Sequence, residues 1–177
     1  GPDTITVQSV GEASEALNSL GEGRSIGLRG PLGKGFTLLG ERILIIGGGV
    51  GTAPLAFLGE QAMNAGMEVT SLIGYRCCSD MIFLKRFQRL GRTIVTTDDG
   101  SSGIRGRVAA GLEALDLDDY DQIYLCGPEL MMWDVISRSR EHAKKTQACI
   151  NRYFKCAVGI CGSCCLDPDG LRVCVEG

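Results

Sequence analysis

The chain has 177 residues, of which 44% are hydrophobic and 22% are charged, and its formal net charge is −3. This balance is typical of a globular domain and excludes the basic surface of a nucleic-acid-binding protein. No apolar run reaches the roughly 18 residues that a membrane-spanning helix needs. The nine cysteines occur without a signal peptide, so we expect reduced thiols and a cytoplasmic location.

The first 36 residues predict a small, incomplete β-structure. Residues 4–7 alternate as a strand does, residues 12–20 have helical spacing, and residues 24–28 read as a second strand. A loop with three glycines and a proline follows at residues 30–36. Because two strands and one short helix cannot bury a core of their own, we interpret residues 1–36 as the remnant of a larger β-barrel.

Residues 42–46 (R-I-L-I-I) form a continuous apolar run, which is typical of a strand buried on both faces of a parallel sheet. A glycine-rich turn and a helix over residues 55–65 follow directly. Strand, glycine turn and helix N-terminus in this order predict a pyrophosphate site, because backbone amides and the helix dipole favour an anion there. A tight turn without a ligand is the alternative, since Pro54 breaks the G-x-G-x-x-G pattern. The candidate residues of this turn are Gly47, Gly48, Gly49, Gly51, Thr52 and Pro54.

Further strand and helix patterns alternate along the middle of the chain. We expect strands at residues 68–74, 92–97 and 121–125, with helices at residues 79–90 and 108–114. Repeated βα units predict an α/β fold, a doubly wound parallel sheet whose site lies along the carboxyl ends of its strands.

Charged residues in the loops after these strands bear on the choice of nucleotide. Asp98 and Asp99 would repel the 2′-phosphate of NADP if they lie near the adenosine ribose. Arg76, Arg105 and Arg107 could attract that phosphate instead. Each of these side chains could equally be a solvated surface charge, so the residues alone leave NAD and NADP open.

The last 29 residues carry a cysteine pattern, C-x4-C-x2-C followed by nine residues and a final cysteine. This is the plant-type ferredoxin spacing, in which four thiolates hold a [2Fe-2S] cluster. Gly159 and Gly162 permit the tight bends that such a loop needs, and residues 171–175 are expected to return as a strand. The predicted ligands are Cys156, Cys161, Cys164 and Cys174.

Other readings of the cysteines compete with the cluster. A structural zinc site would more naturally use two C-x2-C pairs, and only one is present. Cys165 is expected to pack or to face solvent, and Cys77 and Cys78 to be partly buried thiols. With one histidine, His142, the chain offers neither a Rieske-type ligand set nor an obvious acid/base residue, so we assign no catalytic side chain.

Several motifs together resemble the ferredoxin reductase superfamily and, more narrowly, the family of iron-sulfur electron-transfer subunits of dihydroorotate dehydrogenase. The joint match covers nearly the whole chain. The motifs are G-G-G-V-G-T-A-P at 47–54, C-G-P-E-L-M at 126–131, G-P-L-G-K-G-F at 30–36, T-D-D-G at 97–100 and R-Y-F-K-C at 152–156. The last motif leads into the four predicted cluster ligands, Cys156, Cys161, Cys164 and Cys174, which we call the cysteine cage.

This resemblance implies three segments, with the barrel remnant at 1–36, an NAD-binding domain at 37–148 and a cluster-binding segment at 149–177. In the family, electrons pass between NAD, FAD, the [2Fe-2S] cluster and a separate FMN-containing dihydroorotate dehydrogenase subunit of pyrimidine biosynthesis. The glycine turn would then hold the NAD pyrophosphate. The residues expected near the nicotinamide are Cys126, Gly127 and Pro128. A dimer or heterotetramer is implied in the same way.

The sequence departs from this family at two places. No flavin-binding R-x-x-S-type strand precedes Gly30, so we expect FAD in the intact protein but find no basis for FAD binding by this chain. Asn151 stands where the family often has glutamate close to the redox centre. Two other functions stay open, namely a diaphorase-type subunit of a hydrogenase or ferredoxin:NADP oxidoreductase, and a nucleotide-binding regulatory module with structural zinc.

Overall fold

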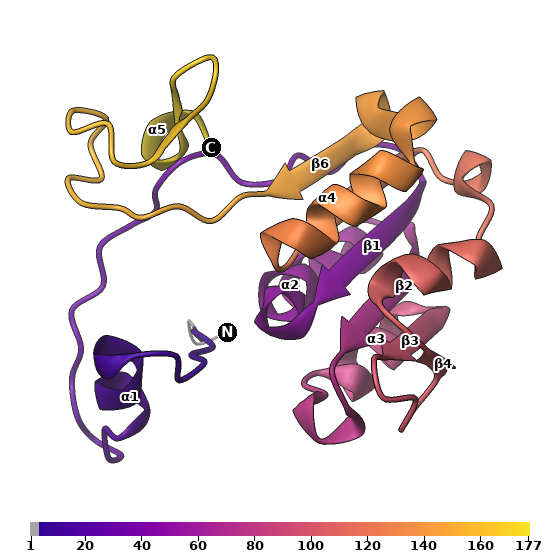
Figure 1. Ribbon diagram of the computed structural model, residues 1–177, viewed down its shortest axis with the longest axis horizontal. Coiled ribbons are helices and arrows are strands. Elements are labelled where there is room, and N and C mark those ends of the chain that lie inside the picture. Colours follow the sequence, from indigo (N-terminus) through magenta and orange to yellow (C-terminus); the bar gives the residue numbers. More distant parts are fainter. Residues whose placement is uncertain (1–3) are drawn as a thin grey trace.

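The computed structural model describes residues 4–177, and its centre is a six-stranded parallel sheet (Figure 1). The strands follow the order β4-β3-β2-β1-β5-β6, and every neighbouring pair is parallel. The predicted doubly wound α/β fold is therefore confirmed. The strands are β1 (Arg42–Gly48), β2 (Glu68–Tyr75), β3 (Thr93–Thr97), β4 (Ile104–Arg105), β5 (Gln122–Cys126) and β6 (Thr146–Cys149).

Helices cover both faces of the sheet and give it two separate apolar layers. Ile43 and Ile45 of β1 pack beneath α2 and α3, whereas Leu44 and Ile46 face η3 and α4. All four side chains are at most 1% exposed, which explains why this strand reads as a continuous apolar run. The helices are α1 (Glu12–Asn18), η1 (Gly49–Gly51), α2 (Thr52–Asn64), η2 (Cys78–Asp80), α3 (Leu84–Leu90), η3 (Val108–Ala114), η4 (Leu117–Asp119), α4 (Glu129–Arg138), η5 (Arg140–Lys145) and α5 (Val173–Glu176).

The strand order reverses between β1 and β5. From β1 the chain moves outward through β2, β3 and β4, and then returns to pair β5 with the other side of β1. Ligands of doubly wound folds bind outside the carboxyl ends of the strands at such a reversal. Gly47 of β1 stands opposite Cys126 of β5 at this end, so the two predicted nucleotide motifs meet there.

The N-terminal strands that the sequence predicts do not form. Within the described residues no strand precedes Arg42, and segments 4–7 and 24–28 are irregular. A strand needs a neighbouring strand to pair with, and neither segment is paired with one within residues 4–177. Only the helix of this region is found, over Glu12–Asn18, and it stands apart from the sheet (Figure 1). The structure therefore does not confirm a β-barrel remnant in residues 4–36.

Three other expectations needed correction. The helix predicted at 79–90 begins only at Leu84, because Phe83 adopts a left-handed conformation with φ 59°. The returning strand predicted at 171–175 is limited to Leu171–Arg172, and α5 follows it. The sequence analysis missed β6 (Thr146–Cys149), a short edge strand that is only half-buried and therefore lacks an apolar run.

Tyr124 of β5 attaches residues 33–41, the connector that precedes β1, to the sheet. Its ring packs edge-on against Phe36, with centroids 5.4 Å apart. Its hydroxyl accepts a hydrogen bond from Leu39 N at 3.0 Å and donates one to Thr37 O at 2.9 Å. Gln147 of β6 also bonds Thr37, through both its side-chain oxygen and its side-chain nitrogen. Side chains of β5 and β6 thus hold this connector in place beside the carboxyl edge of the sheet.

We expect Tyr124→Phe to lower the free energy of unfolding by about 1 kcal/mol, because it leaves Leu39 N–H without its partner and removes one of the two hydrogen bonds to Thr37 O. Chemical denaturation of the two proteins measures this difference. Tyr153→Phe is the matched control, since Tyr153 is 72% exposed and should give no measurable change. Equal stability of Tyr124→Phe and the native protein would show that the hydroxyl does not fix the connector.

Candidate functional site

A cleft of about 1340 Å³ lies along the carboxyl edge of the sheet. It is lined by the ends of β1, β2, β3, β5 and β6 and by the C-terminal segment. Gly47 and Thr52 do not line this cleft, although the sequence analysis included them. The predicted residues that do line it are Gly48, Gly49, Gly51, Pro54, Asp98, Cys126, Gly127 and Pro128.

The glycine turn brings its backbone unusually close to the next strand. A Cβ atom on Gly51 would lie 2.6 Å from Gly127 Cα and 2.7 Å from Cys126 O, which only glycine avoids. Gly49 has a φ of 53°, a conformation that favours glycine. Thr52 is fully buried, and its hydroxyl donates to Gly49 O at 2.7 Å. Thr52 therefore supports the turn from below, at the point where α2 begins and its positive dipole end faces the cleft.

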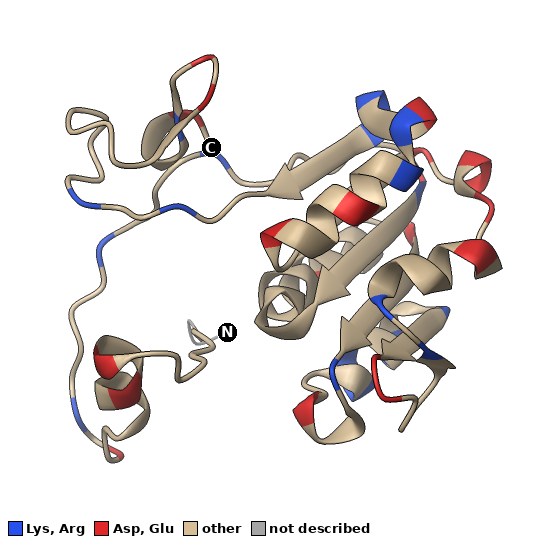
Figure 2. Cartoon of the chain, viewed as in Figure 1, with Lys and Arg blue, Asp and Glu red and all other residues tan. Residues whose placement is uncertain are grey.

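Three charged side chains border the outer part of the cleft, after β2 and β3. Asp98 and Arg76 line it, as does Arg107, whereas Arg105 does not. Arg76 donates to the Asp80 carboxylate at 3.0 Å, so part of its charge is already compensated. In the described part of the chain, both acidic and basic residues are scattered over helices and loops (Figure 2).

Two thiols meet at the ends of β5 and β6. Cys126 and Cys149 are register partners on these strands, and both line the cleft. The Cys126 thiol donates a hydrogen bond to the Cys149 sulfur, and this bond together with burial raises the pKa of Cys126. The same hydrogen bond lowers the pKa of Cys149 to about 7. The sequence analysis placed Cys126 near the cleft but gave no sign of its partner.

The four predicted cluster ligands occur as two pairs of neighbouring thiols. Cys156 interacts with Cys161 in the first loop, and Cys164 interacts with Cys174 across the hairpin formed by β7 (Cys165–Leu166) and β8 (Leu171–Arg172). Cys164 and Cys174 are buried, whereas Cys161 is exposed. The φ angles of Gly159 and Gly162 are 78° and 71°, so both glycines make the tight bends that the sequence predicts.

This arrangement fits a two-iron cluster better than a single ion. Among residues 4–177, no three His, Cys, Asp or Glu side chains converge on one point as ligands of one metal ion. A structural zinc site needs such convergence, whereas each iron of a [2Fe-2S] cluster takes two thiolates. Backbone N–H groups of Val158, Ile160 and Cys161 donate to Cys156 Sγ at 3.4–3.5 Å. These bonds lower the pKa of Cys156 to about 6, which favours the thiolate that binds iron.

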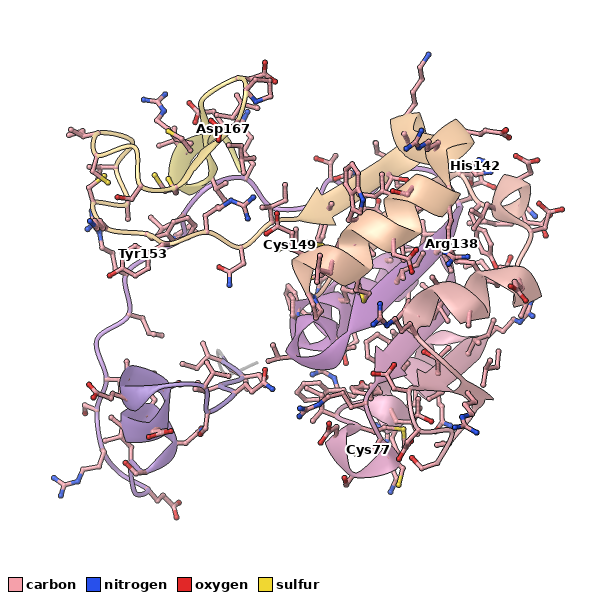
Figure 3. All side chains as sticks on the ribbon, in the orientation of Figure 1. Cys77, Arg138, His142, Cys149, Tyr153 and Asp167 are labelled. Atoms are coloured by element: carbon pink, nitrogen blue, oxygen red, sulfur yellow. The ribbon has the colours of Figure 1, made fainter. Side chains whose placement is uncertain are left out.

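The remaining cysteines stand outside the two pairs. Cys165 is exposed, which agrees with one of its two expected placements. Cys77 is half-buried as expected, but Cys78 is exposed, and its backbone N–H binds the Ser101 hydroxyl at 2.8 Å. Figure 3 shows Cys77 at the opposite end of the molecule from Tyr153 and Asp167, which belong to the C-terminal segment.

The C-terminal segment packs directly against the edge of the cleft. Gly33 N donates to Cys174 O at 2.9 Å, and a Cβ atom on Gly33 would lie 2.6 Å from Val173 O. Arg152, just after β6, forms an ion pair of 3.1 Å with Glu129 at the start of α4. Phe154, Val173, Glu176 and Gly177 line the same cleft as the nucleotide motifs. Residues that neighbour the cysteine cage therefore line the same cavity as the candidate nucleotide site, although the four cysteines themselves do not.

The sequence analysis missed Phe36, Tyr75 and Cys149, which also line this cavity. Tyr75 donates from its hydroxyl to Ile82 O at 2.6 Å and to Thr52 Oγ1 at 3.3 Å. Its place as the last residue of β2 could have been read from the strand pattern. Cys149 could have been found only with β6 in hand, because its partner is 23 residues away.

Two known protein families match the two parts of the chain that line the cavity. The family described as the iron-sulfur cluster binding domain of dihydroorotate dehydrogenase B matches residues 151–177. The family described as the oxidoreductase NAD-binding domain matches residues 45–136.

Among curated proteins, the chain is 50% identical over 177 residues to a probable dihydroorotate dehydrogenase B (NAD(+)), electron transfer subunit, of Methanocella arvoryzae. That alignment covers 99% of this chain and 69% of the relative. The chain belongs to the family of electron-transfer subunits of dihydroorotate dehydrogenase B. A further member, from Methanothermobacter thermautotrophicus, is 45% identical over 98% of this chain and 65% of its own length. The chain thus spans about two thirds of its relatives.

Solved structures also place this electron-transfer subunit in the ferredoxin reductase superfamily that its sequence resembles. The structure of an NADH-dependent reduced ferredoxin-NADP oxidoreductase matches with a TM-score of 0.85 and 28% identity, over 97% of this chain and 64% of that chain. The ferredoxin reductase of carbazole 1,9a-dioxygenase shares the fold, with a TM-score of 0.64 and 21% identity over 81% of this chain and 49% of its own. The expected resemblance is therefore confirmed. No helix within residues 4–177 is long and apolar enough to cross a membrane.

Proposed function

We propose that the chain is the nucleotide- and cluster-binding part of an electron-transfer subunit that connects NADH with an FMN-containing dihydroorotate dehydrogenase subunit in the cytoplasm. NADH delivers two electrons as hydride, a flavin such as the FAD expected in the intact protein converts them to single electrons, and a [2Fe-2S] cluster carries one at a time. The observation that carries this proposal is the cavity that the glycine turn lines together with Phe154, Val173 and Glu176, which neighbour the cysteine cage in the chain.

The roles of individual residues follow from their places in this cavity. We infer that Gly48, Gly49 and Gly51 hold the pyrophosphate at the start of α2, supported by Gly47, Thr52 and Pro54. We infer in the same way that Cys126, Gly127 and Pro128 border the nicotinamide. The [2Fe-2S] ligands would be Cys156 and Cys161 on one iron and Cys164 and Cys174 on the other. We also keep the proposed division of the chain into three segments, with boundaries near residues 36 and 148. The pairing of the thiols supports this assignment.

We propose NADH rather than NADPH as the donor. Asp98 is exposed and lines the outer end of the cleft, where its carboxylate would repel a 2′-phosphate. Arg76 is already paired with Asp80, which leaves less positive charge for such a phosphate. The relatives' names, which include NAD(+), support the same choice.

The test uses the full-length protein, purified without oxygen and analysed for iron, sulfide and flavin. We expect about two irons and two sulfides per chain, and bleaching of the visible absorption by NADH at far lower concentration than by NADPH. Addition of the FMN-containing subunit with dihydroorotate and NAD should then produce NADH. A colourless, iron-free protein would contradict the proposal, and so would a coloured protein that NADH cannot reduce.

A second candidate function rests on the structural match to the NADH-dependent ferredoxin-NADP oxidoreductase. The chain would then exchange electrons with ferredoxin rather than with a dihydroorotate dehydrogenase. The two functions separate in one assay, because reduced ferredoxin should reduce the cluster in the second case, and dihydroorotate with the catalytic subunit should reduce it in the first. The higher identity to the dihydroorotate dehydrogenase B subunits favours the first.

A further inference from the structure

Cys126 and Cys149 lie side by side where β5 and β6 end. They are register partners, so their side chains leave the same face of two adjacent parallel strands. Adjacent strands are about 4.7–4.9 Å apart, and this separation lies within the roughly 4.4–6.8 Å that disulfides span between Cα atoms. Each thiol also shifts the pKa of the other. No large backbone movement is needed to join them.

The two thiols differ in access and in acidity. Cys149 is exposed at the mouth of the cleft, whereas Cys126 is only 7% exposed. The hydrogen bond from Cys126 lowers the pKa of Cys149 to about 7, so a large share of Cys149 is thiolate near neutral pH. An accessible thiolate beside a buried thiol is the arrangement of an attacking and a resolving cysteine.

We propose that Cys126 and Cys149 form a reversible disulfide, which acts as a thiol switch on the nicotinamide end of the cleft. The location of the switch rests on the proposed function, because that function puts the nicotinamide beside Cys126. The disulfide itself does not depend on it.

The oxidant that the proposal names is a low-molecular-weight disulfide. The Cys149 thiolate attacks one of its sulfurs, a mixed disulfide forms, and the first small thiolate leaves. Cys126 then loses its proton and attacks Cys149 Sγ, which forms the Cys126–Cys149 bond and expels the second small thiolate. The protons of the two cysteines end on the two small thiols, so two protein thiols are oxidised and one small disulfide is reduced. A small dithiol reverses both steps.

The switch would reach the nucleotide through close backbone contacts. The Cys126–Gly127 peptide lies against Gly51, where even a Cβ atom would be only 2.6–2.7 Å away. Gly127 is in turn packed on Gly48, with 3.0 Å between its hypothetical Cβ atom and Gly48 N. The disulfide would remove a thiol from the cleft wall, and because these contacts leave no spare room, even a small shift of Cys126 toward β6 would disturb the glycine turn. We expect the disulfide to weaken NADH binding by at least about fivefold, the lower end of typical coupling between sites.

The pair can be followed separately from the other seven cysteines. Cleavage after arginine and lysine yields residues 108–138 and 146–152 as two peptides, with Cys126 the only cysteine of the first and Cys149 the only one of the second. The full-length, cluster-loaded protein is equilibrated without oxygen in buffers of increasing glutathione disulfide to glutathione ratio, alkylated, digested and analysed by mass spectrometry.

We expect both alkylated peptides to disappear together as one cross-linked species appears, two hydrogens lighter than the sum of the two unmodified peptides. The visible absorption, measured on each sample, should stay constant and so report an intact cluster. The proposal is overturned if both cysteines stay alkylated at every ratio. It is also overturned if Cys149 accumulates as a mixed disulfide with glutathione and never joins Cys126.

NADH binding to the reduced and oxidised protein tests the switch. The native protein should lose at least about fivefold in affinity on oxidation, and Cys149→Ser should bind NADH equally in both buffers. Cys78→Ser is the matched control, because Cys78 is exposed but lies outside the cleft, and it should respond as the native protein does. A cross-linked protein with unchanged affinity would overturn the switch. Failure of the reduced protein to bind any NADH would instead contradict the proposed function and leave the cross-link result standing.

Discussion

Replacement of Cys174 by serine should remove the iron-sulfur cluster, whereas replacement of Cys165 should leave it in place. Cys174 is 4% exposed and interacts with Cys164, so a serine there leaves one iron with a single thiolate in a buried position. Cys165 is exposed and lies outside both thiol pairs, although it neighbours Cys164 in the chain. We expect iron to fall from about two per chain to about a tenth of that in Cys174→Ser.

The two variants form a matched pair, because each exchanges one sulfur for one oxygen in the same C-terminal segment, Cys165 in β7 and Cys174 in α5. Iron analysis and visible absorption of full-length proteins purified without oxygen measure the cluster. NADH binding to each variant then shows whether the nucleotide site has survived, and we expect it unchanged within about twofold for Cys165→Ser. If Cys165→Ser lost as much iron as Cys174→Ser, the ligand assignment would be wrong. Full iron content in Cys174→Ser would have the same consequence.

The parts of the site that could be predicted from sequence are those whose signal is local. Residues 42–46 are buried by layers on both faces, so the strand is apolar throughout, and the glycines that follow report a backbone approach that excludes side chains. The cysteine spacing also lies within one short segment. Each of these signals needs only neighbouring residues to be recognised.

The parts that failed depend on partners far along the chain. Residues 4–7 have the alternation of a strand, but alternation does not tell whether a neighbouring strand exists to bond it, and here none does. The edge strand Thr146–Cys149 has the reverse problem, because it pairs with β5 although its own sequence carries little apolar signal. The contact of Cys126 with Cys149 was invisible for this reason. The sequence of one strand alone does not determine which strand it pairs with or in which register.

Coupling between the cage and the cleft also comes from such distant contacts. Gly33 has a φ of 66° and fits against the backbone of Val173, so the connector before β1 lies between the sheet and the cysteine segment. Tyr124 and Gln147 hold the next residues of that connector to the sheet. The separation between the candidate nucleotide site and the cysteine segment is thus set in part by this connector, which itself lines the cleft. This arrangement suits electron transfer, which needs a fixed separation but no bond between the two sites.

Replacement of Gly51 by alanine should abolish most NADH binding. The new methyl group would lie 2.6 Å from Gly127 Cα and 2.7 Å from Gly127 N, and both are backbone atoms that cannot rotate away. Either the glycine turn or the Cys126–Gly127 peptide must move, and both border the cleft. We expect a loss of at least about tenfold in NADH affinity, equivalent to about 1.4 kcal/mol, and a fall of about 1–3 kcal/mol in the free energy of unfolding from overpacking.

Titration of the full-length protein with NADH and chemical denaturation measure the two effects. Gly21→Ala is the matched control, because no atom lies within 4 Å of the position of its Cβ and its φ is not positive, so it should change neither quantity. Iron content should be unaffected in both variants, since the thiol pairs lie outside the glycine turn. Native NADH affinity in Gly51→Ala would mean that the nucleotide binds away from this turn. A pyrophosphate bound at the turn would lose contacts when the backbone beside it is displaced.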